Sequence, residues 1–236
     1  MICRISDLIV NVKEVGSLAP YLQNYRYEGT RPADIVIDPK QYDPKFYGPL
    51  LSGSDVEYME SGRIYHCGLL RHNGFYLHAS AVEYEGKAYL FSAPSGTGKS
   101  THTRLWQQHL GDKVRIFNDD KPSLRRLEET WYAYGTPWCG KDHININLKV
   151  PLAGVCFLKQ GPENHIRRLN SQEAVNKILS QTIRRFHSGE RLDLLLGHLD
   201  KFVREIPVFE LENLPVPEAA KLSYETMRQA AEEMGL

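Results

Sequence analysis

The sequence predicts an α/β protein built on a mixed sheet, in which parallel and antiparallel strands occur together. Apolar β-type runs at 75–82 and 87–91 are joined by a short Glu-Gly turn, which is typical of an antiparallel hairpin. The second run leads into a helix-compatible segment at 101–110 and then a further β-type run at 114–117. A helical crossover of this kind connects parallel strands.

Fewer signals are available before residue 74. We expect strands at 2–12 and 33–37, where β-branched and other apolar residues concentrate. Prolines and glycines over 38–55 are typical of a loop. The segment 56–70 resumes regular structure, and its pattern leaves open whether it is strand or helix.

Beyond the run at 114–117, the pattern predicts more strands and three helices. A capping box opens the first helix at Asn170, and a proline at its start together with a glycine at its end delimits the last. The expected strands lie at 122–126, 130–134, 144–150, 151–158 and 207–211. The expected helices lie at 170–186, 192–203 and 217–234.

Composition excludes several classes of protein. Lys and Arg together number 29, as do Asp and Glu, so the 236-residue chain has no net charge that would favour nucleic acid or an acidic membrane. Its four scattered cysteines argue against a zinc cluster and a disulfide framework. We expect no signal peptide and no membrane-spanning run, hence a cytoplasmic protein. A single domain over 1–236 is expected, with a β-rich part at 1–73 and a nucleotide-binding core with C-terminal helices at 74–236.

A glycine-rich segment between the run at 87–91 and the helix at 101–110 is the strongest motif. Its strand–loop–helix context is the one that a phosphate-binding P-loop requires. Glycines allow tight turns and a close approach of backbone N–H groups to phosphate, and the new helix adds its own unpaired N–H groups. Position 93, where the pattern usually begins with glycine, is alanine. The expected nucleotide-binding residues are Ser95, Gly96, Thr97, Gly98, Lys99, Ser100 and Thr101.

Two adjacent acids, Asp119 and Asp120, end the strand at 114–117, about twenty residues after Lys99. The strand–helix–strand order brings them to the same sheet edge as the loop, which is where open α/β sheets bind ligands. A carboxylate there can organise Mg²⁺, and another can accept the proton of an attacking hydroxyl. Without the upstream loop, a solvated turn or a helix cap would be the simpler interpretation.

Other candidates allow two interpretations each. His78, on the hairpin, can approach a transferred phosphate or simply pack. His102 is expected on the exposed face of its helix. The loop 135–142 either covers a nucleotide, with Lys141 on phosphate, or is a structural turn with Trp138 on the core. Two further residues, Arg167 and Arg168, either bind phosphate or are solvated. No base partner can be found for Cys139 as a nucleophile.

Three segments carry a resemblance to a known family. The strand Leu77–Val82, the loop Ser95–Thr101 and the turn Asn118–Asp120 resemble the catalytic domain of bacterial HPr serine kinase/phosphorylase, whose fold is shared with phosphoenolpyruvate carboxykinases. The resemblance is closest over about residues 74–125. The family's segment linked to the phosphorylase reaction has no match, so the resemblance implies a diverged member.

The resemblance also implies roles for individual residues. Lys99 would be a phosphate-binding catalytic lysine, and Ser100 a Mg²⁺ ligand. Asp120 would be the general base, with Asp119 near the metal and His78 near the transferred phosphate. ATP and Mg²⁺ are the implied cofactors.

We therefore expect an ATP-dependent, Mg²⁺-requiring kinase that transfers the γ-phosphoryl group to a hydroxyl, with a serine of a protein or peptide as acceptor. Two alternatives stay open: a small-molecule kinase or carboxykinase-like enzyme, and a nucleotide-binding regulator without catalysis. The sequence leaves undecided the acceptor, the choice among ATP, GTP and pyrophosphate, any reverse reaction, and whether the chain forms a homo-oligomer.

Overall fold

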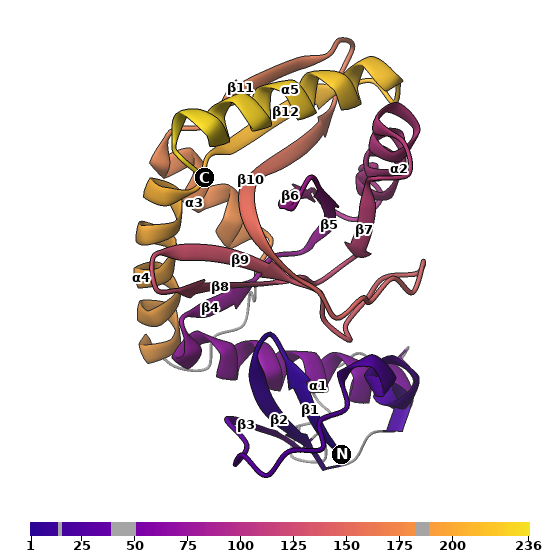
Figure 1. The fold of residues 1–236 in the computed structure, drawn as a ribbon, viewed down its shortest axis with the longest axis vertical. Helices are drawn as coiled ribbons and strands as arrows, with labels where there is room; N and C mark the ends of the chain where they lie inside the picture. The colour runs from indigo at the N-terminus through magenta and orange to yellow at the C-terminus, as the bar shows by residue number, and fades with distance from the viewer. Residues whose placement is uncertain (14–15, 39–50, 183–188) are drawn as a thin grey trace.

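A computed structural model gives the protein a mixed α/β fold around a curled sheet (Figure 1). The central strand is β10 (Lys149–Gln160), which runs parallel to β6 (Lys87–Ser92) and to β12 (Val208–Asn213). The prediction of an α/β protein with a mixed sheet is confirmed. The structure describes residues 1–13, 16–38, 51–182 and 189–236.

Antiparallel strands complete this sheet. They are β4 (Gly74–Tyr76), β5 (Ala79–Tyr84), β7 (Arg115–Asn118), β8 (Ser123–Leu127), β9 (Thr130–Tyr134) and β11 (His165–Arg168). The order across the sheet is β4-β8-β9-β10-β6-β5-β7, with β12 and β11 continuing from β10. Since β5 is antiparallel to both β6 and β7, the latter two are parallel, and their carboxyl ends meet at one edge as predicted.

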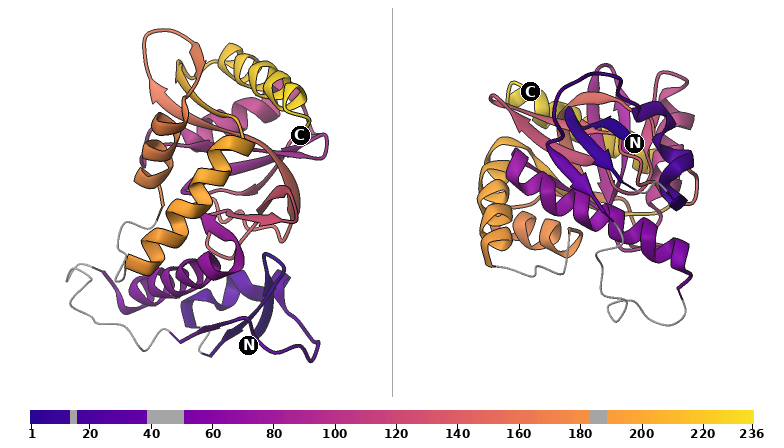
Figure 2. Two further views of the ribbon diagram at one scale, coloured as in Figure 1. Left: turned by 90° about the vertical axis from the view of Figure 1, so that its left-hand side faces the viewer. Right: turned by 90° about the horizontal axis from the view of Figure 1, so that it is seen from below.

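Helices cover both faces of the sheet (Figures 1 and 2). On one face, α2 (Lys99–Leu110) and α5 (Pro217–Glu233) pack against side chains such as Phe91. On the other face, α3 (Ser171–Ser180) and α4 (Gly189–Glu205) pack against side chains such as Leu90. Neighbouring residues of β6 thus enter different cores, as the two-residue period of a strand requires. None of the helices in the described residues is both long and apolar enough to cross a membrane.

A smaller unit precedes the large sheet, and we call it the N-terminal lobe. It consists of β1 (Ile2–Ile5), β2 (Leu8–Val12), the 3-10 helix η1 (Gly16–Tyr25), β3 (Ile35–Ile37) and α1 (Gly53–Leu69). A short 3-10 turn, η4 (Leu70–His72), connects it to β4. The helix α1 lies between the small sheet and the large one (Figures 1 and 2). One buried cluster joins both parts, because Trp138 from the large part packs with the lobe's own core. The expectation of a single domain, with parts at 1–73 and 74–236, stays a prediction.

Three expectations about strands are corrected. The run 2–12 is two strands, because Ser6 and Asp7 have positive φ angles of 51° and 61° and form a tight turn between them. The run 75–82 is also divided: β4 pairs with β8, whereas β5 pairs with β6. The runs 144–150 and 151–158 are one strand from Lys149 onward, preceded by irregular backbone.

The segment 56–70, which the pattern left open, is helical. Ser52 caps α1 in a reciprocal capping box with Asp55, which satisfies N–H groups at the helix start. The helix expected at 170–186 ends at Ser180, and its predicted last residues, from 183 on, lie outside the described residues. Residues 39–50 of the predicted loop also lie outside them. The sequence did not predict η1 or β11.

Candidate functional site

The glycine-rich loop lies between β6 and α2, at the carboxyl edge of the sheet. Gly96 and Gly98 have φ angles of 81° and 110°, a region that favours glycine. Gly98 is the N-cap of α2 and offers no side chain to its first turn, so the N–H groups there are left for an external anion. Ala93 is buried and is not among the residues with positive φ, so a side chain is tolerated where glycine is usual.

A cavity of about 470 Å³ opens beside this loop. Its lining joins segments that are distant in sequence: the loop, the start of β5, the end of β7 and the segment around Lys141. Of the predicted site residues, Thr97 alone is not in the lining, and its N–H donates to the Pro94 carbonyl at 3.3 Å. The lining residues are His78, Ser95, Gly96, Gly98, Lys99, Ser100, Thr101, Asp119, Asp120, Gly140 and Lys141.

Lys99 is the buried cation of this cavity. Its Nζ donates to the Ala93 carbonyl oxygen at 2.9 Å, which is a neutral partner. Burial lowers the pKa of Lys99, the nearby Lys121 charge acts in the same direction, and Asp120 opposes them. Because the ammonium is partly stripped of water, an incoming phosphate would interact with it more strongly than in bulk solvent.

The turn that follows β7 is shaped by Asn118, which is fully buried. Its Oδ1 accepts the N–H groups of Asp120 at 3.2 Å and Lys121 at 2.8 Å, and its Nδ2 donates to the Thr136 carbonyl at 3.0 Å. An Asn side chain that binds the backbone two and three residues on is a common way to build a tight turn. This turn directs the two acids to different partners.

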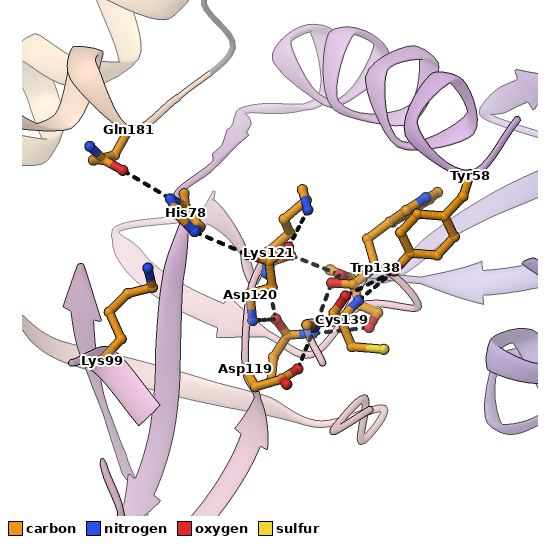
Figure 3. Close-up of polar contacts among 12 residues, drawn as sticks. Tyr58, His78, Lys99, Asp119, Asp120, Lys121, Trp138, Cys139 and Gln181 are labelled. Atoms are coloured by element: carbon orange, nitrogen blue, oxygen red, sulfur yellow. Dashed lines mark hydrogen bonds and ion pairs between the residues drawn. The ribbon is translucent and has the colours of Figure 1, made fainter. Parts of the chain in front are cut away.

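Asp120 lies between the side chains of His78 and Lys121 (Figure 3). Its Oδ1 is 3.1 Å from His78 Nε2, and its Oδ2 pairs with Lys121 Nζ. Burial acts to raise the pKa of Asp120, but the hydrogen bonds and charges of His78 and Lys121 outweigh it and lower the pKa to about 2. The carboxylate is therefore ionised at neutral pH. His78 is held in turn by Gln181, whose Oε1 lies 2.9 Å from Nδ1.

Asp119 holds the opposite wall of the cavity. Its Oδ1 accepts the Gly140 N–H at 2.7 Å, and its Oδ2 accepts the Asp142 N–H at 3.0 Å. Burial raises the pKa of Asp119 and the Asp120 charge adds to this, whereas the two backbone N–H groups lower it; the net direction is upward. The adjacent carboxylates thus have different surroundings: Asp119 is bonded to a loop, and Asp120 lies beside His78 and Lys121.

The residues predicted to bind Mg²⁺ fit that ion. Ser100 and Asp119 line the same cavity, and each Asp119 oxygen accepts one N–H and keeps another lone pair. Mg²⁺ in nucleotide sites usually has one or two protein ligands, with waters and phosphates completing its shell. Within the described ranges, no group of three or more His, Cys, Asp or Glu side chains is placed to hold a metal. The metal assignment stays a prediction.

A second cavity, of about 320 Å³, adjoins the first. The two share His78 and Asp120, and the second is completed by Tyr76, Lys121 and the end of α3 at Ser180, Gln181 and Thr182. Sequence reasoning missed Lys121 and Gln181. The first directly follows the acid pair and offered a weak signal, whereas nothing in the sequence around Gln181 linked it to His78.

Several other expectations are resolved. His102 is buried rather than exposed, because α2 packs on α5 at this point; its Nε2 lies 3.0 Å from Ser223 Oγ. Burial raises the pKa of Cys139 to about 11, with Asp119 contributing, which agrees with the expectation that it is not a nucleophile. Trp138 is core, as the structural interpretation of that loop expected, and Lys141 lines the cavity. Binding of a nucleotide by the loop stays a prediction. Arg167 forms surface ion pairs with Glu173 and Glu210.

The fold and the cavity define a mixed α/β protein with a glycine-rich loop and two acids at one sheet edge. A family model described as "SynChlorMet cassette protein ScmC" matches residues 59–213, and the chain belongs to this family. The structure is also distantly similar to an HPr(Ser) kinase/phosphatase from Coxiella burnetii, with a TM-score of 0.38 and 11% identity. That similarity covers 68% of this chain and 99% of the other. No curated protein matches the sequence.

Proposed function

We propose that the protein is a P-loop kinase of the HPr kinase/phosphoenolpyruvate carboxykinase type. It would use ATP and Mg²⁺ to phosphorylate a hydroxyl, with a serine of a protein or peptide as acceptor. The observation that carries the proposal is one cavity lined by the glycine-rich loop, Lys99, Asp120 and His78. Phosphoryl transfer requires positioning and charge neutralisation more than covalent chemistry, and these groups supply both.

The roles follow from the surroundings of each group. Backbone N–H groups of the loop and of the first turn of α2 would hold the phosphate chain, with Lys99 on its β- and γ-oxygens. Mg²⁺, bound with the nucleotide through Ser100 and Asp119, would neutralise phosphate charge. Asp120, ionised and held by His78, would orient the acceptor hydroxyl and take its proton.

The low pKa of Asp120 bears on which of its two contributions is larger, orientation of the acceptor hydroxyl or removal of its proton. A carboxylate with a pKa of about 2 is a weak base, so early proton removal would contribute little. In a loose transition state the acceptor proton leaves late, when the hydroxyl has become acidic. Orientation of the acceptor is then the main contribution of Asp120. The second cavity, which shares Asp120 and His78 with the first, supports entry of the acceptor from that side.

Calorimetric titration of Mg-ATP into the wild type and into Lys99→Ala tests the proposal. We expect the variant to bind at least tenfold more weakly, which corresponds to about 1.4 kcal/mol. Lys113→Ala, at an exposed lysine after α2, is the matched control for loss of one charge. If the wild type gives no binding heat with ATP or GTP, the kinase proposal is wrong.

A further inference from the structure

The wall of the cavity opposite the glycine-rich loop is a short segment, Gly140–Asp142, whose central residue is Lys141. Both neighbours of Lys141 are fixed: their N–H groups donate to the two oxygens of Asp119, at 2.7 and 3.0 Å. Asp142 also forms an ion pair with Arg104 of α2, at 2.9 Å. The backbone on either side of Lys141 is thus held at three points, while its own side chain lines the cavity.

The N-terminal lobe braces this segment from behind. Tyr58 Oη on α1 accepts the Cys139 N–H at 2.8 Å and donates to the Cys139 carbonyl at 3.0 Å (Figure 3). Trp138 donates through Nε1 to Ser61 Oγ at 3.1 Å and stacks on Tyr65 with ring centroids 4.6 Å apart. Three partners from the same helix therefore fix the chain just before Lys141.

The bracing continues after Lys141. Tyr21 Oη of η1 lies 3.1 Å from His143 Nδ1, and the two rings are stacked. Tyr25 Oη donates to the Asn145 carbonyl at 3.0 Å. Side chains far away in sequence thus hold the backbone on both sides of one exposed lysine. A surface turn with no other role would not require this many contacts.

The Lys141 ammonium forms no ion pair in the part of the chain that the structure describes. Among the described residues, no carboxylate lies within ion-pair distance of its ammonium, although Asp119 and Asp142 flank it. The same cavity holds the buried ammonium of Lys99 on its other wall. A polyphosphate bound in this cavity would meet both ammonium groups and pair with them.

We propose that Lys141 is a second phosphate-binding cation of this pocket, that it binds the terminal phosphate of a nucleoside triphosphate, and that Tyr58 positions it from the N-terminal lobe. The inference rests on the proposed function and deepens it. The terminal phosphate is assigned because Gly140, next to Lys141, is bonded to Asp119, so Lys141 lies on the side of the acids. Loop N–H groups would hold the remainder of the phosphate chain, and Lys99 would contact its β- and γ-oxygens.

Titration calorimetry with Mg-ATP and Mg-ADP separates this inference from the proposed function. We expect Lys141→Ala to weaken ATP binding at least tenfold and ADP binding less than threefold. Lys141→Arg should restore most of the ATP affinity, since the charge is kept, and Lys113→Ala should change neither affinity. Tyr58→Phe, which removes both contacts to Cys139 and keeps the ring, should weaken ATP binding about threefold and leave ADP binding unchanged.

Three results would count against the inference. Unchanged ATP affinity in Lys141→Ala, with a wild type that binds ATP, removes Lys141 from the pocket and leaves the kinase proposal intact. Equal losses for ATP and ADP contradict the assignment to the terminal phosphate. A wild type that binds neither nucleotide overturns the proposed function and this inference together.

The role of Tyr58 has its own test. A purely structural role of Tyr58 would lower the unfolding midpoint in urea without changing the ratio of ATP to ADP affinity, and this result would contradict its assignment as a positioning residue.

Discussion

The two walls of the cavity are built in different ways. The glycine-rich loop is held by contacts within itself: Lys99 bonds to Ala93, six residues away, and Thr97 bonds to Pro94. The segment Gly140–Asp142 is held by Asp119, more than twenty residues away, and its neighbour Cys139 is held by Tyr58, 81 residues away. Local backbone geometry makes the first wall, whereas the second also depends on contacts with the N-terminal lobe.

This difference indicates which substitutions should disturb each wall. Substitutions in the loop should change ligand binding and chemistry with little effect on folding, because few distant contacts depend on it. Substitutions that loosen the N-terminal lobe should lower stability and displace the second wall while the loop persists. Each prediction below alters one side of this comparison.

The largest effect is expected at Asp120, which lies between the walls. Asp120→Asn should reduce phosphoryl transfer by about 10²-fold, since it removes the carboxylate that orients the acceptor hydroxyl. The measurement is ADP release from Mg-ATP, followed by transfer to an acceptor once one is identified. Asp112→Asn, at an exposed residue after α2, is the control. Turnover near the wild-type rate in Asp120→Asn would refute the assignment.

Trp138→Ala should destabilise the second wall most. The side chain is 1% exposed and packs in the core that the N-terminal lobe shares with the large part. Replacing a buried Trp by Ala costs about 3–5 kcal/mol, which urea denaturation would measure. The fraction that stays folded should still bind ADP through the first wall. Loss of ADP binding by folded protein would show that the walls are not independent.

Ser223→Ala tests the support behind the first wall. Ser223 Oγ on α5 accepts from Trp106 Nε1 at 2.9 Å and lies 3.0 Å from His102 Nε2, and all three residues are buried. Leaving buried polar atoms without partners should lower the free energy of unfolding by about 1–3 kcal/mol. Nucleotide affinity should stay within threefold of wild type. Ser171→Ala, at an exposed serine of α3, is the control.

The ion pairs of Asp120 should make stability depend on pH. Its folded-state pKa of about 2 is lower than the ordinary value of 3.8, so the native state favours the carboxylate. The resulting stabilisation, about 2 kcal/mol, is present above pH 4 and is lost as the pH falls toward 2. The difference in unfolding free energy between wild type and Asp120→Asn should shrink over that interval. A constant difference would contradict the pairing.

The features that the sequence predicts are mainly those built by local contacts, as in the first wall of the cavity. The strand β6, the glycine-rich loop and α2 are encoded by short-range signals, and β6 and α2 were predicted within two residues of their observed bounds. The division of the run 75–82 into β4 and β5 was not predicted, because alternation cannot reveal which partner strand each half will pair with. His102 was misjudged for a similar reason: its burial depends on α5, more than a hundred residues later.

The sequence by itself determined the glycine-rich loop and helix start of residues 93–101, since glycine positions and a helix start depend mainly on neighbouring backbone. Tertiary structure alone decided that Gln181 holds His78 and that Asp119 binds a loop while Asp120 contacts His78. It also decided that Tyr58 holds Cys139, two residues before Lys141. These relations join residues whose separation along the chain carries no periodic signal. They arise because burial of separate apolar faces brings their segments together, and polar groups then take the partners that packing leaves within reach.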